Sequence, residues 1–270
     1  MKNRLLTIAV IHFKADKNLL YKCINSIKRA AKKQYKKIQI DIIHGKNGKE
    51  IDWSSFLKDF DDMYIRVFNN PKSEVNFQNQ LSIDVCETDY WTVLDDDDEL
   101  EDDSIDKFLE QFNPKENIDC YQLRITRYGK EQSSWIASMI MNHAKIYKIQ
   151  SIRENNIYFH EKLTTNEDAW FGTLFTCFNP KIKGLDIPFY KWIEVENSIT
   201  DQWKKNNEKW KNINLLTIKL LIEEYKKRKQ QWAFHMFKRT MFIHILTAKS
   251  SGCTDDELDL INEEIKKVGD

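Results

Sequence analysis

Short apolar runs that alternate with helix-like segments constrain the fold of this chain more than any other feature. Residues 4–13, 38–43, 64–68 and 90–94 are compact runs rich in β-forming residues, and they predict strands. Helical spacing of apolar residues marks the segments 16–31 and 73–86 between them. Strands and helices that alternate in this way predict βαβ units, hence an α/β fold with a mainly parallel sheet flanked by helices.

The rest of the chain is expected to continue this fold and then to change character. A strand is predicted at 117–128, a helix capped by Thr164 or Thr165 follows, and residues 182–200 are expected to be extended. From Asp201 onward the sequence looks helical and is rich in Lys, Trp and Phe. We therefore expect an α/β domain over residues 1–200 and a basic, aromatic helical extension over residues 201–270. The helix at 73–86 is expected to pack through apolar residues: Val75, Phe77, Leu81 and Val85.

Cysteine usage and hydropathy indicate a cytoplasmic protein. Without a run of 18 apolar residues the sequence offers no transmembrane helix, and its first apolar run is too short for a signal peptide. Scattered cysteines without a C-x-x-C pair argue against a zinc site or a disulfide framework, and they predict buried thiols in a reducing compartment. These are Cys23, Cys86, Cys120, Cys177 and Cys253.

The formal net charge is +0, but the charges are unevenly distributed. Residues 84–119 contain fifteen acidic residues against two lysines, whereas residues 203–239 contain eleven basic residues against three acids. The first segment is suited to a cation and the second to an anionic partner. Aromatic residues interleave with the lysines of 203–239. This segment therefore fits peripheral contact with a membrane or a nucleic acid, or helices that bury their aromatics against the core.

Polar residues follow three of the predicted strands: "HFKA", "HGKNG" and "DDDD". In parallel sheets, ligands bind beyond the carboxyl ends of the strands, so these segments are expected to meet at one site. Alternate residues at a strand end point the same way, so Asp95 and Asp97 are expected to converge. Clustered carboxylates favour a cation, and oxygen ligands suit Mg²⁺ or Mn²⁺. The residues alone leave both a metal site and a solvated acidic turn open.

Five segments, which follow the family's order along the chain, resemble family 2 glycosyltransferases. "DYWTVLDDDDEL" is similar to the family's D-x-D segment, and "IAVIHFKADKNLLYKCINSI" to its opening strand and helix. "VNFQNQLSIDVCETDYW", "NHAKIYKIQSIRENNIYFHEKLTTNEDAWFGTLF" and "IPFYKWIEVENSIT" extend the resemblance to about residue 200. The resemblance implies a GT-A (Rossmann-like) fold and an inverting hexosyl- or pentosyltransferase that uses a nucleotide-sugar donor.

Carried over to this chain, the resemblance assigns the chemical roles. It implies that Asp97 coordinates Mn²⁺ or Mg²⁺, that Asp95 contacts the donor's ribose or the metal shell, and that Asp98 is a possible helper. The "ED" pair places Asp168 as the catalytic base, beside Glu167 as a possible site residue. The alternative for this pair is a favourable interaction with a helix dipole.

The same resemblance places donor contacts where the chain departs from the family pattern. His12 and Lys14 stand in the family's P-x-Y-N segment, and Asn47 lies where the family has D-D-G-S. Asn79 keeps the family's asparagine, and Lys145 matches a lysine that contacts acceptor or phosphate. We expect a UDP-sugar donor, with the nucleobase left open by these substitutions.

The acceptor is expected to be a surface glycan or a lipid-linked saccharide at the inner face of the membrane. A phage-type glycosyltransferase acting on hydroxymethylated bases in DNA is the alternative. A nucleotidyltransferase or a non-catalytic nucleic-acid or glycan-binding module belongs to other classes. The absence of glycine from "HFKADKN" counts against nucleotidyl transfer, since such enzymes place a glycine-rich loop there. The histidines other than His12 show no ligand spacing and are expected to be mostly structural.

Overall fold

One mixed sheet organises the residues that the computed structural model describes, which are 4–13, 17–46, 51–129, 132–138, 140–194, 207–229 and 232–269. The strand order is β3-β2-β1-β4-β8-β6-β9-β5, and β7 pairs with β6. The strands are β1 (Leu6–His12), β2 (Ile38–Gly45), β3 (Ile65–Asn70), β4 (Tyr90–Asp95), β5 (Glu99–Leu100), β6 (Cys120–Tyr128), β7 (Ser133–Ile136), β8 (Lys145–Lys148) and β9 (Ile182–Ile193).

The first half of this sheet is parallel, as predicted. β1 pairs in parallel with β2 and with β4, and β2 pairs in parallel with β3. All seven residues of β1 are buried, because both faces of the strand are covered, and this explains its unbroken apolar run. The register sets His12 opposite His44 and Ile11 opposite Asp95. The carboxyl ends of β1, β2 and β4 therefore lie side by side.

The second half mixes directions. β8 is antiparallel to β4 and to β6, whereas β6 and β9 are parallel. β4 pairs with β8 only through its first two residues, so the end of β4 is not paired with β8. The short β7 pairs with the distal part of β6.

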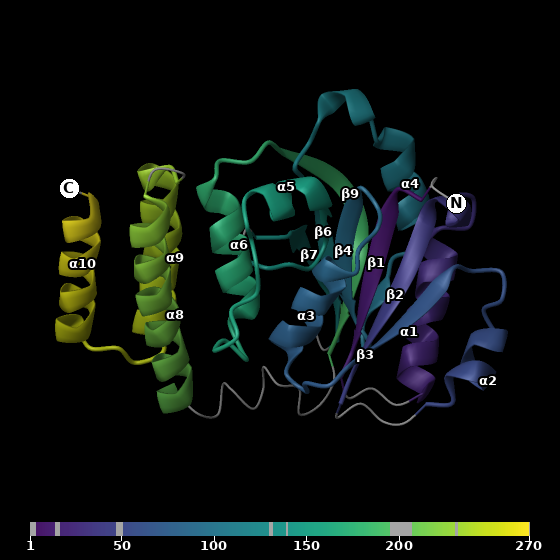
Figure 1. Cartoon of the computed structure of the whole chain (residues 1–270), viewed down its shortest axis with the longest axis horizontal. Coiled ribbons are helices and arrows are strands. Elements are labelled where there is room, and N and C mark those ends of the chain that lie inside the picture. The colour runs from purple at the N-terminus through teal and green to yellow at the C-terminus, as the bar shows by residue number, and fades with distance from the viewer. Residues whose placement is uncertain are drawn as a thin grey trace.

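Helices cover both faces of the sheet (Figure 1). They are α1 (Lys17–Ala30), α2 (Trp53–Lys58), α3 (Val75–Asp84), α4 (Ser104–Gln111), α5 (Ile149–Glu154), α6 (Glu167–Cys177), α8 (Asn207–Arg228), α9 (Phe234–Ser250) and α10 (Asp255–Gly269). One core cluster joins the sheet to α1, α2 and α4. The other joins it to α3, α5 and α6 and continues into α8, α9 and α10. In Figure 1 the three C-terminal helices lie beyond α6, with α8 and α9 overlapping in this view and α10 outermost.

The predicted packing face of α3 is partly right, because Val75, Leu81 and Val85 pack against the core cluster without being fully buried. Its four predicted core residues, Val75, Phe77, Leu81 and Val85, are only half-buried, whereas Asn76, Gln78, Asn79 and Ser82 are buried together with Ile83. Several of the buried polar groups have hydrogen-bond partners. Nδ2 of Asn76 donates to the carbonyls of His160 and Glu161, and the Oγ of Ser82 accepts from Nε1 of Trp91. Such partners offset the cost of burying amides and hydroxyls.

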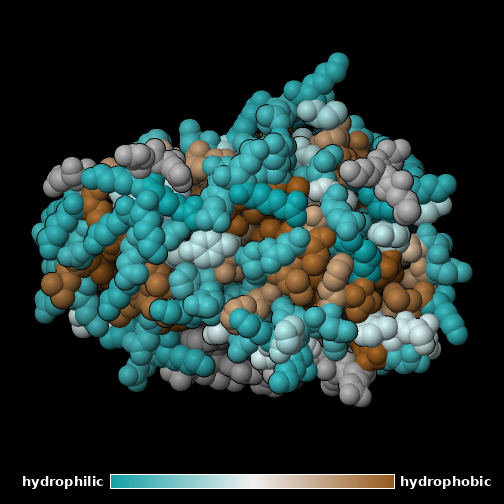
Figure 2. All heavy atoms as spheres, viewed as in Figure 1, coloured by the Kyte–Doolittle hydropathy of each residue, from teal (hydrophilic) through white to brown (hydrophobic). Residues whose placement is uncertain are grey.

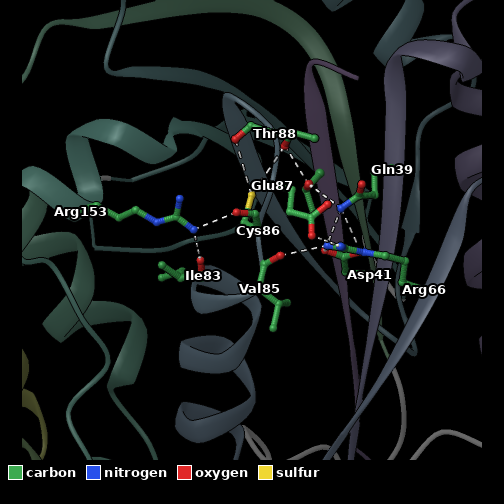
Figure 3. A network of polar contacts seen from close by, with 10 residues as sticks. Gln39, Asp41, Arg66, Ile83, Val85, Cys86, Glu87, Thr88 and Arg153 are labelled. Atoms are coloured by element: carbon green, nitrogen blue, oxygen red, sulfur yellow. Dashed lines mark hydrogen bonds and ion pairs between the residues drawn. The ribbon is translucent and has the colours of Figure 1, made fainter. Parts of the chain in front are cut away.

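A polar network fixes the carboxyl end of α3 against the sheet (Figure 3). The guanidinium of Arg66 on β3 donates to both carboxylate oxygens of Asp41 on β2, at 2.8 and 2.9 Å. It also donates to the carbonyl of Val85. Arg153 donates to the carbonyls of Ile83 and Cys86 at 2.9 and 2.8 Å. These bonds satisfy carbonyls that a helix end leaves without partners.

Most described aromatics of the C-terminal segment are buried or half-buried, whereas Phe242 on α9 is exposed. Tyr225, Trp232 and Phe237 belong to the core cluster, while Trp210 is half-buried and Trp203 lies outside the described residues. Hydrophilic residues cover most of the face in Figure 2, with hydrophobic atoms visible in its middle and near the C-terminal helices. Among the described helices, none has the length and apolar character needed to cross a bilayer. The predicted boundary at residue 200 falls outside the described residues.

All five cysteines are buried, which confirms the prediction of buried thiols.

Candidate active site

Three carboxylates gather where β4 ends. Asp95 is the last residue of β4, and a turn closed by the amide of Asp98 on the carbonyl of Asp95 (3.1 Å) follows it. Ligand oxygens of Asp95, Asp97 and Asp98 lie within 4.8 Å of one another. Burial and the nearby Asp95 raise the pKa of Asp97 to about 7 and that of Asp98 to about 8. The cluster confirms the predicted convergence of Asp95 and Asp97.

This donor set fits a hard divalent cation. Carboxylate oxygens are the ligands that Mg²⁺ and Mn²⁺ prefer, and a cation would relieve the mutual repulsion that raises these pKa values. Asp98 is already held on both oxygens. The hydroxyl of Tyr190 donates to Oδ2 at 2.6 Å, and the amide of Ile193 donates to Oδ1 at 2.7 Å. Asp98 thus anchors the turn to β9, while Asp95 and Asp97 are better placed to serve as ligands.

Asp96, for which no separate role was predicted, ties the acidic turn to β1. Its Oδ2 lies 2.6 Å from Nδ1 of His12 and accepts from the amide of Phe13 at 2.9 Å. The predicted donor residue His12 is fully buried, and its ring stacks on that of His44 at 5.0 Å between centroids. Its Nε2 has no hydrogen-bond partner among the described residues. The donor contact predicted for His12 stays a prediction.

The "ED" pair opens α6. Asn166 precedes it in the left-handed conformation (φ 66°), which turns the chain into the helix and leaves Glu167 and Asp168 in the first turn. The side-chain amide of Asn142 donates to Oδ1 of Asp168 at 2.7 Å. Burial raises the pKa of both carboxyls, and Asp168 raises that of Glu167 further. A carboxylate with a raised pKa is a stronger base.

His143 joins the two acidic groups. Its Nε2 lies 3.1 Å from Oδ2 of Asp95, and its Nδ1 lies 3.6 Å from Oδ2 of Asp168. Burial lowers the pKa of His143, but the two carboxylates outweigh it and raise the pKa to about 10. Ala144, the next residue, has a φ of 54°, an uncommon conformation for alanine, and such strain clusters at functional sites. The expectation that His143 is structural overlooked this position between the acids.

Of the remaining predicted site residues, Lys145 and Asn79 are described, and two others are not. Lys145 is fully buried, its ammonium donates to the carbonyl of Met141, and burial lowers its pKa to about 8. Asn79 is buried on α3, and its Oδ1 has no hydrogen-bond partner among the described residues. Lys14 and Asn47 lie outside the described residues.

The geometry brings the carboxylate cluster of Asp95, Asp97 and Asp98 and the carboxylate of Asp168 to opposite sides of the His143 imidazole. Such an arrangement suits a transfer in which one side holds a charged leaving group and the other accepts a proton.

Comparisons with known proteins show similarity at the level of family and fold. The family model described as "Glycosyl transferase family 2" matches residues 7–178. No curated protein matches the chain. Among solved structures, S. aureus TarS 1–349 in complex with UDP-GlcNAc superposes with a TM-score of 0.65 and 13% identity, over 98% of this chain and 72% of that chain. The same TarS segment in complex with UDP gives 0.61 and 13%, over 81% and 65%.

A longer structure of S. aureus TarS gives a TM-score of 0.62 with 12% identity and covers 81% of this chain. The chain matches 40% of that TarS chain. At such identities these structures share the GT-A type of fold with the described residues, a mixed α/β sheet flanked by helices.

Proposed function

The chain belongs to glycosyl transferase family 2 and is a glycosyltransferase, and we propose that it moves a sugar from a UDP-sugar to an acceptor hydroxyl with inversion of configuration. The observation that carries this proposal is the placement of Asp168 opposite the Asp95–Asp97 cluster, with His143 between them. The UDP-GlcNAc held by TarS in a structure of similar fold supports a uridine donor.

In the proposed reaction, Asp97 and Asp95 hold Mn²⁺ or Mg²⁺. The bound cation would neutralise the charge that grows on the departing nucleoside diphosphate. Asp98, held by Tyr190 and Ile193, keeps the turn that carries these ligands in place.

Asp168 accepts the proton of the acceptor hydroxyl as that oxygen attacks the anomeric carbon. The bond from this carbon to the diphosphate oxygen breaks in the same step, so the configuration inverts. Asn142 and His143 fix the orientation of the Asp168 carboxylate. We place this reaction in the cytoplasm, with a glycan or a lipid-linked saccharide at the inner membrane face as acceptor.

Donor binding is tested by thermal shift with UDP and UDP-GlcNAc, with and without Mn²⁺. Ligand at a hundredfold excess over Kd should add about 2.7 kcal/mol of stability. Asp97→Asn should abolish the Mn²⁺-dependent part. Asp102→Asn, in the same acidic run but paired with Arg29 at 2.9 Å, is the matched control and should behave like the native chain. Equal Mn²⁺-dependent shifts in native and Asp97→Asn protein would remove Asp97 from the metal site.

The base is tested with Asp168→Asn. This variant should bind UDP normally and transfer about 10²–10⁴-fold more slowly, since it removes the proton acceptor and keeps the size of the side chain. Turnover is measured as UDP release in the presence of acceptor. The exposed Glu161→Gln is the control. Normal turnover by Asp168→Asn would show that another group takes the proton.

A further inference from the structure

A pair of tryptophans lies next to the candidate active site and is not used by the proposed reaction. Trp135 on β7 and Trp192 on β9 are both half-buried, and their rings meet edge to face with centroids 6.3 Å apart. The guanidinium of Arg127 lies 5.2 Å from the centre of the Trp192 ring. Large aromatic rings left partly open to solvent beside a site are suited to ligand contact.

The sheet register places this pair on the face of the strands that carries Tyr190. Trp135 and Tyr190 are both opposite Ile125, one on each neighbouring strand. Trp192 follows Tyr190 by two residues, so its side chain points to the same side, about 7 Å further along the strand. Tyr190 in turn donates to Asp98 and packs its ring 4.8 Å from that of His143. Tyr190 therefore lies between the tryptophan pair and Asp98 of the acidic turn.

The strand order also indicates whether the donor or the acceptor would contact the two tryptophans. β4 and its aspartates lie between β1 and β2 on one side and the β8–β6–β9 group, with β7, on the other. The proposed donor lies at the ends of β1 and β2. The tryptophans lie on the opposite side, where an acceptor has to approach.

The charges around the pair favour a neutral ligand. Each basic side chain nearby on β6 and β9 lies against a carboxylate. The pairs are Arg124 with Asp186 (3.0 Å), Arg127 with Glu194, and Lys191 with Glu101 (3.8 Å). A nucleic acid needs basic groups to neutralise its phosphates, and these bases are already neutralised. A pyranose ring needs no such charge, because its axial C–H bonds pack on an indole face.

We propose that Trp135 and Trp192 form an acceptor subsite that stacks a pyranose ring of a neutral saccharide beside Asp98. This inference rests on the proposed glycosyl transfer and adds to it the residues that bind the acceptor and the neutral character of the bound ring.

The subsite is tested by ¹⁹F NMR of protein labelled with 5-fluorotryptophan, in the presence of UDP and Mn²⁺. Trp135→Phe and Trp192→Phe assign the two signals. The probes are the methyl glycosides of glucose, galactose and N-acetylglucosamine, and a short single-stranded DNA. At least one glycoside should move both signals and leave those of the core residues Trp91 and Trp170 in place. The proposal would be overturned if the DNA moved both signals. It would also be overturned if no glycoside moved them.

Variants separate this subsite from the donor site. Trp135→Ala and Trp192→Ala should weaken binding of the responsive glycoside about tenfold. They should keep the native thermal shift with UDP-GlcNAc. Phe242→Ala, at an exposed aromatic on α9, is the control and should change neither. Glycoside binding unaffected by either alanine variant would sink the subsite. If the native protein does not bind UDP at all, the proposed function itself is wrong.

Discussion

His143 is the residue on which the two halves of the candidate site depend. It is 48 residues from Asp95 in the sequence, and it lies within 3.6 Å of carboxylate oxygens on both Asp95 and Asp168. Two carboxylates on either side of one half-buried imidazole are held in place by opposite charge and hydrogen bonding. A change at this single position should therefore disturb both.

We expect His143→Ala to lower the transfer rate by at least about tenfold, because Asp168 loses one of the groups that orient it. The measurement is kcat at saturating UDP-sugar, together with the unfolding midpoint in urea. His235→Ala, at an exposed histidine of α9, is the control. A native kcat in His143→Ala would mean that Asn142 alone orients Asp168.

At the residue scale, the sequence predicted the acidic cluster but not the different contacts that each aspartate makes. Asp95 and Asp97 follow a buried strand, and that placement is visible from the chain alone. The ties from Asp96 to His12 and from Asp98 to Tyr190 join residues 84 and 92 positions apart. Spacing along the chain carries no signal for such contacts.

At the scale of elements, the pairing of β2 with β3 includes an ion pair that is buried at one end and exposed at the other. Arg66 contacts Asp41, whose side chain is 0% exposed, and Glu87, whose side chain is 68% exposed. Burial raises the pKa of Asp41 despite the arginine beside it. Removing the arginine would leave a buried carboxylate without its counter-charge.

Arg66→Met should thus reduce the free energy of unfolding by about 3–5 kcal/mol, measured by urea denaturation at neutral pH. Glu87→Gln removes the exposed partner of the same arginine and should cost no more than about 1 kcal/mol. Equal losses in the two variants would contradict the distinction between the buried and exposed ends.

The elements themselves followed from the sequence better than their packing did. Continuous apolar runs predicted β1, β2 and β4, because strands covered on both faces are uniformly apolar, whereas the half-buried edge strand β3 was predicted from its β-forming residues. The buried side of α3 was assigned to Val75, Phe77, Leu81 and Val85. Tertiary hydrogen bonds, such as those from Asn76 to the chain near His160, make a polar side the buried one. The left-handed Ala144 likewise has no signature in its residue type.

At the scale of the whole molecule, α6 connects the candidate site to the C-terminal helices. Its first turn carries Asp168, and its body packs against α9. Asn166, at the start of α6, donates to Asn214 on α8 at 2.9 Å. Thr173 on α6 lies 2.9 Å from Nε2 of His244 on α9. The basic, aromatic extension thus supports the helix that presents the proposed base.

His244 should make this packing sensitive to acid. Burial lowers its pKa from an ordinary 6.5 to about 4, so the folded protein holds it neutral. The unfolded chain binds its proton first, so stability is complete above about pH 6.5 and falls as the pH drops towards 4. The loss attributable to this group is about 3 kcal/mol.

The measurement is the free energy of unfolding from pH 7 to pH 4 in the native protein and in His244→Gln. The variant should be less stable at pH 7 and should show a shallower decline with acid. His235→Gln, on the exposed side of α9, should keep the native slope. Identical slopes in native and His244→Gln protein would assign the acid sensitivity to other groups.

The burial of all five cysteines has a practical consequence for spectroscopy. Thiol reagents reach buried sulfurs slowly, so a cysteine introduced on the surface can be labelled selectively without first removing the native ones. Ser133→Cys, at the exposed start of β7, would carry a fluorescent dye within reach of Trp135. Quenching of that dye by the neighbouring indole would then record, in real time and without a chemical turnover, each arrival and departure of a ligand at that edge of the protein.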